Sequence, residues 1–201
     1  MKITGCETLH CDAGWRNFSF LKLLTDDGLV GIAEYNESYG SKGLTAVIEA
    51  LVDTLVGDDP YRHELASQKL YAITRQAHGG LNQQAIAAIE NAMLDIKARS
   101  LGVPVYDLLG GAVRTELPLY WSHCGTYRMT EENAKMMDRP HLACLDDLTA
   151  LGAEVRERGF TALKTNIFLF GEDPPRHFPG FARGPGWPEL NAEKKLVDAL
   201  R

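Results

Sequence analysis

Lys164 and Asn166 are the residues whose types and spacing point most directly to chemistry. They stand two positions apart in Phe160–Phe168, a segment that predicts a β-strand. Alternate residues of a strand project to the same face, so we expect both side chains on one surface. A lysine ammonium binds anionic oxygens, whereas an asparagine amide cannot take up a proton at neutral pH. The alternative is a lysine at a strand end that reaches only solvent.

The loop His10–Asn17, between two predicted strands, holds a second set of candidates. Trp15 can supply apolar cover, and Arg16 can pair with a carboxylate through its planar fork. Asn17 can form a hydrogen bond with a hydroxyl group. These three are therefore candidate substrate-binding residues. An ordinary hairpin loop, with the tryptophan packed on its own domain, remains an equal alternative.

His63 and Glu64 are adjacent residues of metal-ligating types. A metalloprotease helix needs a second histidine four positions after the first, and that position is Ser67. The metalloprotease motif is therefore absent, and the sequence assigns no metal ligand.

The composition is that of an ordinary globular chain, with 201 residues of which 45% are apolar and 24% charged. A net charge of −6 gives no reason to expect nucleic acid or an anionic membrane as a partner. No apolar run approaches the roughly 18 residues that a membrane span requires. The four cysteines form no C-x-x-C pair, so we expect reduced thiols and a cytoplasmic protein.

The first half of the chain predicts an α+β unit. Strands are expected at 1–10, 18–25 and 29–34, with a glycine turn before the last. From Lys42 the apolar residues recur with helical period. Asp59 and Pro60 have the residue types that cap and open a second helix, and Gly102 is placed to end a third.

The second half predicts alternating strands and helices. A strand at 117–122, a polar connection to about 140, a helix with Leu142, Leu145, Leu148, Leu151 and Val155 inside, and a strand at 160–168 make a βαβ unit. A long loop is expected at 171–188 and a last helix at 192–201.

Three motifs together resemble the enolase superfamily, in its mandelate racemase and muconate lactonizing group. They are Gly28-Leu-Val-Gly-Ile-Ala-Glu34, the run Ala88–Gly111 followed by Arg114, and Lys164-Thr-Asn166, where the group has a Lys-x-Lys pair. The resemblance implies an α+β capping domain at 1–113, followed by an incomplete α/β (TIM-type) barrel at 114–201. A complete barrel needs roughly 250 residues, so the chain is expected to be a fragment.

The resemblance also implies an activity. Such enzymes abstract the proton α to a carboxylate and stabilise the product with Mg²⁺. Their metal ligands come from the third, fourth and fifth barrel strands, so no Mg²⁺ ligand is expected in this chain. The parent enzyme would act on a small carboxylic acid or acid sugar, and a homo-oligomer is expected. The 201-residue chain alone is expected to be inactive.

The sequence departs from the group at one position. The second lysine of the Lys-x-Lys pair is a base, and here Asn166 stands in its place, which disfavours racemisation by two bases. We therefore expect an acid-sugar dehydratase with Lys164 as the catalytic residue, and a racemase, epimerase or cycloisomerase is the alternative. From a different class, the chain would be a non-catalytic oligomerisation or binding module.

Overall fold

The computed structural model describes residues 1–14, 16–171, 176–178 and 187–200. The chain divides into two compact units, Met1–Val113 and Arg114–Arg201. Among the described residues, no helix is both long enough and apolar enough to cross a lipid bilayer.

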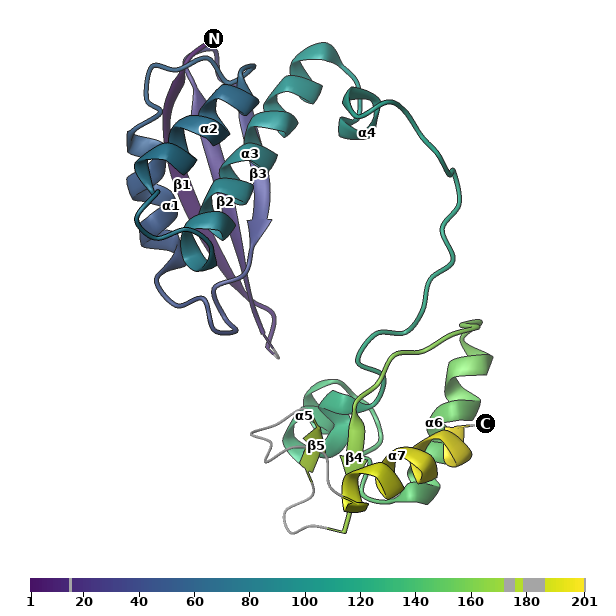
Figure 1. The fold of residues 1–201 in the computed structure, drawn as a ribbon. Coiled ribbons are helices and arrows are strands. Elements are labelled where there is room, and N and C mark those ends of the chain that lie inside the picture. Colours follow the sequence, from purple (N-terminus) through teal and green to yellow (C-terminus); the bar gives the residue numbers. More distant parts are fainter. Residues whose placement is uncertain (15, 172–175, 179–186, 201) are drawn as a thin grey trace. The chain divides into compact units, whose positions relative to one another are not determined.

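A three-stranded antiparallel sheet forms one layer of the first unit (Figure 1). Its strands β1 (Ile3–Asp12), β2 (Asn17–Thr25) and β3 (Val30–Tyr35) neighbour one another in sequence order. Alternate residues of β2, including Leu21 and Leu23, are fully buried, as in a sheet covered on one face. The three strands expected from the sequence are confirmed.

Helices α1 (Leu44–Asp53), α2 (His63–Ile73) and α3 (Gly80–Leu101) form the second layer of this unit. α3 packs on β3 and contacts both other helices. Gly102 ends α3 with a φ of 68°, in the left-handed conformation that glycine adopts readily, so the predicted helix end is confirmed. The fully buried core joins both layers and includes Leu21, Leu23, Ile48, Leu55, Ile89 and Ile96.

The second helix begins later than the sequence predicts, at His63 instead of Pro60. The Asp59 carboxylate accepts the N–H of Tyr61 at 2.9 Å, and its carbonyl accepts the N–H of Arg62 at 3.1 Å. Asp59 therefore closes a separate turn ahead of the helix, and the prediction that it caps α2 is wrong.

Gly31 allows β3 and α3 to approach closely. A Cβ atom on Gly31 would lie 2.0 Å from the carbonyl oxygen of Ala92, which leaves no room for any side chain. On the outer edge of β3, the N–H of Ile32 donates to the carboxylate of Asp95 on α3 at 2.9 Å. This helix and this strand are thus joined by both packing and a hydrogen bond.

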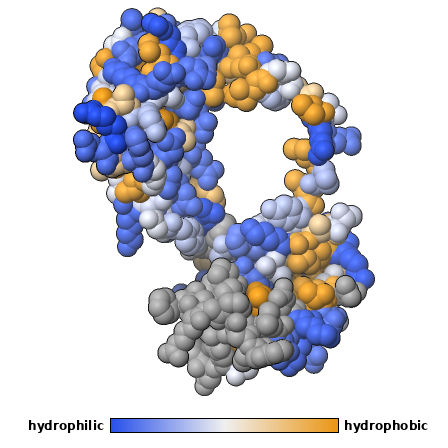
Figure 2. Space-filling view, in the orientation of Figure 1, coloured by the Kyte–Doolittle hydropathy of each residue, from blue (hydrophilic) through white to orange (hydrophobic). Residues whose placement is uncertain are grey.

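Apolar side chains remain exposed from the end of α3 onward. The segment contains the short helix α4 (Val105–Leu108) and carries Leu109, Val113, Leu117 and Leu119, of which Val113 is 97% exposed. Figure 2 shows apolar residues at the surface around the end of α3, around α4 and along the segment that follows.

The two strands predicted at 117–122 and 160–168 pair with each other only through one parallel bridge, between Trp121 and Leu163. Of the second prediction, only its last two residues lie in a strand, β4 (Ile167–Leu169). The N–H of Trp121 donates to Ala162 at 3.1 Å, and the N–H of Lys164 donates back to Trp121 at 2.9 Å. The longer strands were predicted wrongly. Pro118 has no N–H to extend a ladder, and Leu119 is 72% exposed, so neither pairing nor burial supports a strand there.

The second unit otherwise contains helices and a small hairpin. They are η1 (Thr126–Met129), α5 (Glu131–Met136), α6 (Leu145–Glu157), β4 (Ile167–Leu169), β5 (Arg176–Phe178) and α7 (Trp187–Leu200), with β4 and β5 antiparallel. The first two occupy the predicted polar connection, and β5 lies in the predicted loop. Leu148, Leu151 and Val155 of α6 are buried, as predicted for its inner face. Leu142 is also buried but lies before the helix begins, so the predicted helix start is wrong.

Candidate active site

The turn between β1 and β2 holds the candidates of the first unit. The Asp12 carboxylate accepts the N–H of Gly14 at 2.8 Å, and the N–H of Ala13 donates to the carbonyl of Arg16 at 3.0 Å. These two hydrogen bonds fix the backbone that carries Arg16. Trp15 lies outside the described residues.

Arg16 stacks on two aromatic rings. Its guanidinium carbon lies 4.7 Å from the centre of the Phe18 ring and 5.6 Å from that of Tyr39. An arginine held in this way keeps its charge and its planar set of donors, which suits a carboxylate. Tyr39 is 60% exposed, so this stack borders solvent.

Asn17 connects the hairpin to the segment after β3. Its main-chain carbonyl accepts a hydrogen bond from the Ser38 hydroxyl at 2.9 Å, and its side chain is exposed. The structure therefore brings Arg16 and Asn17, both expected from the sequence, beside residues that come some twenty positions later.

These residues border an open hollow of about 550 Å³. Its lining consists of Asp12, Gly14, Arg16, Asn17, Glu37, Ser38, Tyr39 and Lys42. The sequence reading missed Glu37, Ser38, Tyr39 and Lys42 as members of this site. No local pattern points to them, because only the pairing of β2 with β3 brings their segment to the hairpin.

Glu37 is held in its ionised form. Its carboxylate accepts the Thr45 hydroxyl and, at 2.7 Å, the N–H of Gly43. The Thr45 hydroxyl is the main cause that holds the pKa of Glu37 below its ordinary value, and the N–H of Gly43 adds to it. Glu37 thus keeps a negative charge at the start of α1, while Arg16 and Lys42 bring positive charges to the same hollow.

Lys164 lies in the second unit, directly before β4. Its N–H donates to Trp121 at 2.9 Å and its carbonyl accepts the N–H of Cys124 at 2.8 Å, so its backbone is fixed on both sides. The side chain of Lys164 is exposed. Its ammonium group is therefore accessible. This agrees both with a catalytic lysine and with a lysine at a strand end that reaches only solvent.

Asn166 contacts His177, which belongs to the segment that the sequence predicts as a long loop. Its Nδ2 lies 3.2 Å from Nδ1 of His177, because the pairing of β4 with β5 places the two segments side by side. Burial lowers the pKa of His177, and the nearby His123 lowers it further. A neutral imidazole can accept the hydrogen bond from the amide of Asn166.

Cys124 follows His123 and is not available as a nucleophile. Burial is the main cause that raises the pKa of its thiol to about 11, so the thiolate is scarce at neutral pH. The chemistry that this part of the chain supports is therefore binding by an ammonium and an amide, with a neutral imidazole beside them.

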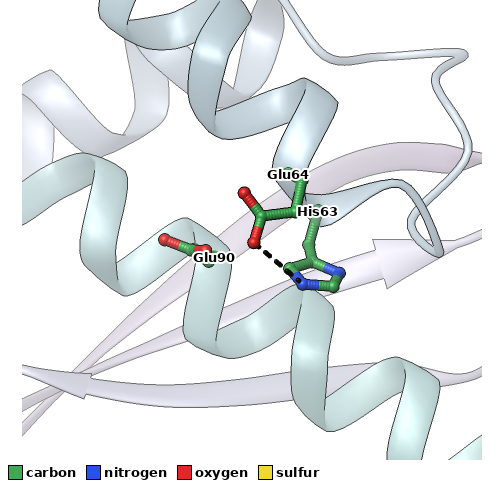
Figure 3. A group of neighbouring side chains, drawn as sticks. All are labelled: His63, Glu64 and Glu90. Carbon is green, nitrogen blue, oxygen red and sulfur yellow. Dashed lines mark ion pairs between the residues drawn. The ribbon is translucent and has the colours of Figure 1, made fainter.

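One group of three potential metal ligands occurs among the described residues, and it consists of His63, Glu64 and Glu90 (Figure 3). These residues belong to α2 and α3 of the first unit. No such group includes Lys164, Asn166 or their neighbours in the described part of the second unit.

Residues 11–110 match the family model of the mandelate racemase / muconate lactonizing enzyme N-terminal domain. The chain therefore belongs to the enolase superfamily, and residues 11–110 correspond to the capping domain of that group.

Curated relatives share the amino-terminal part of the chain. A D-galactonate dehydratase of Pectobacterium atrosepticum is 40% identical over 120 residues, which are 60% of this chain and 31% of that protein. A D-galactonate dehydratase of Xanthomonas euvesicatoria is 39% identical over the same length.

Solved structures match the whole chain. A Burkholderia xenovorans protein, provisionally named an L-alanine-DL-glutamate epimerase, is 43% identical with a TM-score of 0.90, covering 100% of this chain and 52% of that one. A provisionally named dehydratase of Mesorhizobium loti is 25% identical with a TM-score of 0.81, covering 100% and 50%. The chain thus spans about half the length of these structures. The predicted fold class, a capping domain followed by an incomplete barrel, is confirmed.

Proposed function

We propose that the chain forms part of an enzyme that abstracts the proton α to a carboxylate and dehydrates an acid sugar. Residues 1–113 would serve as its capping domain and 114–201 as the opening portion of its barrel. The names of the dehydratase relatives support this reaction class, and a small carboxylic acid is the substrate class they suggest.

The observation that carries the proposal is the presence of Lys164 two positions before Asn166, where related enzymes have two lysines. In a dehydration, one α C–H bond and one β C–O bond break, and the leaving hydroxide departs as water. A single base on one face of the substrate is sufficient for this reaction. Asn166 cannot serve as a base, and its amide is already directed at His177. Lys164, with its exposed ammonium, would bind the substrate's carboxylate oxygens and offset their charge.

The first unit would contribute substrate recognition. Arg16, held by Phe18 and Tyr39, offers a planar donor set for a carboxylate, and Asn17 offers an amide for a hydroxyl. Trp15 would supply apolar cover from the same turn. A polyhydroxylated acid presents both of the groups that these side chains bind.

We propose Mg²⁺ as the cofactor of the whole enzyme, where it would stabilise negative charge on the substrate carboxylate. One of the similar structures, the Burkholderia xenovorans protein, is described as bound to magnesium and fumarate. Magnesium needs several oxygen ligands, and the described residues around Lys164 do not supply a group of three. The metal is therefore assigned to none of the described residues.

The test combines a mass measurement with an activity assay. The complete product of the coding sequence is expressed, its intact mass is measured, and it is incubated with Mg²⁺ and a panel of acid sugars. The expected result is a product longer than 201 residues that forms a 2-keto-3-deoxy acid. Lys164→Met should remove this activity, while Lys135→Met, at an exposed position on α5, should leave it intact. A product of 201 residues without activity would contradict the proposal and favour a binding or oligomerisation module, with a homo-oligomer as its expected state.

An epimerase is the second candidate, because the Burkholderia xenovorans structure carries that name at 43% identity. Incubation in D₂O separates the two reactions. A dehydratase with one base exchanges the α-proton from one face only, whereas an epimerase incorporates deuterium into both epimers.

A further inference from the structure

Three side chains on the helical layer of the first unit converge on one point. His63 and Glu64 come from the first turn of α2, and Glu90 comes from the middle of α3 (Figure 3). Each offers one ligating atom, and these atoms all lie within 4.8 Å of one another. His63 Nε2 lies 3.9 Å from Glu64 Oε1.

The charges at this point are not balanced by a basic residue. Among the described residues, neither Glu64 nor Glu90 forms an ion pair with a lysine or arginine, and His63 is the one ion-pair partner of Glu64. Two carboxylates held near each other repel unless a cation lies between them. The two carboxylates therefore leave a net negative charge at this point, which a bound cation would neutralise.

Polar atoms beside the cluster also lack partners. The Nδ1 atom of His63 and the hydroxyl of Ser67 are buried, and neither has a hydrogen bond among the described residues. Ser67 and Glu90 both line a hollow of about 370 Å³ between α2 and α3. The cluster therefore borders a space with room for water, which a metal with three protein ligands would take as its fourth ligand.

We propose that His63, Glu64 and Glu90 bind a divalent transition metal ion, with Zn²⁺ as the ion of best fit. Zinc accepts imidazole nitrogen and carboxylate oxygen at about 2.0–2.2 Å, which places tetrahedral donors about 3.4 Å apart. The separations between donors need to shorten by at most about 1.4 Å to reach that spacing. The Glu64 side chain is 78% exposed, so no packing opposes its rotation.

The ligand set selects the class of metal. Calcium and magnesium favour sites made of oxygen atoms alone, whereas an imidazole favours zinc and its neighbours in the first transition row. Two carboxylates offset the two positive charges of the ion. Because the ligands come from two helices, the bound ion would clamp α2 to α3 and stabilise the first unit. This site involves neither Lys164 nor Arg16, so it is independent of the proposed catalytic function.

The test measures Zn²⁺ binding to the 201-residue chain by equilibrium dialysis and by thermal unfolding. One ion per chain is expected at this site, and saturating Zn²⁺ should raise the Tm of the first unit by roughly 4 °C or more. His63→Gln and Glu90→Gln should each weaken binding at least tenfold and remove the Tm increase. The matched controls His78→Gln and Glu34→Gln, both exposed residues of the same unit, should bind as the unaltered chain does.

Two further measurements keep the proposal falsifiable. Ser67→His places a second imidazole four positions after His63, on the same helix face, and should tighten Zn²⁺ binding at least tenfold. Co²⁺ bound at this site should give a spectrum without the thiolate charge-transfer band that ligation by Cys11 or another cysteine would add. The proposal falls if neither His63→Gln nor Glu90→Gln changes Zn²⁺ affinity, or if the chain binds no Zn²⁺.

Discussion

The guanidinium of Arg128 donates two parallel hydrogen bonds to the carboxylate of Glu154, at 2.8 and 3.0 Å. The Arg128 side chain is only 4% exposed, and its guanidinium carbon lies 5.7 Å from the centre of the Trp121 ring. Arg158 meets the same carboxylate at 3.1 Å and the same ring at 5.2 Å. This network joins η1 and α6 to Trp121, whose carbonyl accepts the N–H of Lys164 at 2.9 Å.

Removal of one partner should therefore destabilise the second unit strongly. Arg128→Ala leaves the Glu154 carboxylate without its fork-shaped donor and is expected to cost roughly 3–5 kcal/mol of unfolding free energy. Arg128→Lys keeps the charge but not the two parallel bonds and should cost less. Urea unfolding followed by hydrogen exchange of α6 amides measures both. The exposed Arg156→Ala is the control, and an equal loss there would contradict the prediction.

The same pair should make the second unit sensitive to acid. Hydrogen bonding to Arg128 is the main cause that lowers the pKa of Glu154 below its ordinary value. A carboxyl group with a lowered folded-state pKa binds protons less readily when folded, so its stabilising contribution is complete above the unfolded pKa, at about pH 4.3. The contribution disappears as the pH falls through the lower, folded-state pKa. Glu154→Gln should flatten this part of the stability profile, measured by urea unfolding at successive pH values.

Gly31 should tolerate no side chain. In Gly31→Ala, the added Cβ would meet the Ala92 carbonyl oxygen at 2.0 Å, and a helix backbone cannot move aside as a side chain can. We expect a loss of about 3 kcal/mol, at the upper end of the usual cost of overpacking. Thermal and urea unfolding of the whole chain, which report on both units, measure the loss. Gly171→Ala is the control, because a Cβ there meets nothing within 4 Å. Equal effects of the two substitutions would show that the close approach of β3 and α3 is not limiting.

Arg16 should affect substrate binding more than turnover. Arg16→Lys keeps a positive charge but loses the planar fork and most of the stacking on Phe18 and Tyr39. In the complete enzyme, we expect KM to rise about tenfold with little change in kcat, since the residue acts through uniform binding. Arg75→Lys, an exposed change on the same unit, should leave both constants unchanged. A fall in kcat at unchanged KM would oppose a role in binding.

The first unit could be predicted almost completely, because local patterns determine it. Strands with alternating burial, helices with a regular apolar face and the turn at Gly102 all act within a few residues. The second unit was predicted less well. Trp121 and Leu163 form only a single β-bridge. A longer strand needs a neighbouring strand to pair with and a face that is buried, and the local sequence reveals neither.

The candidate site shows the same limit. Lys164 and Asn166 were found because they stand two positions apart, yet His177 comes from another strand and reaches Asn166 only through the β4–β5 pairing. Tyr39 and Lys42 likewise line the same hollow as Arg16 only because β3 pairs with β2. His63 and Glu64 were set aside because position 67 is not a histidine. Glu90 joins them only through the packing of α2 on α3, which no spacing rule along one helix describes.

The hydrogen bond from Ile32 to Asp95 has a consequence for how this chain meets other chains. β3 is one of the two edge strands of its sheet, and its unpaired backbone groups could otherwise form hydrogen bonds with a strand from another molecule. Asp95, whose carboxylate is also paired with Arg99 at 2.8 Å, occupies one of those donors. An incoming strand would have to displace the carboxylate and bury its charge. This edge of the first unit is thus protected against the addition of a strand by a side chain of the helix that packs on β3.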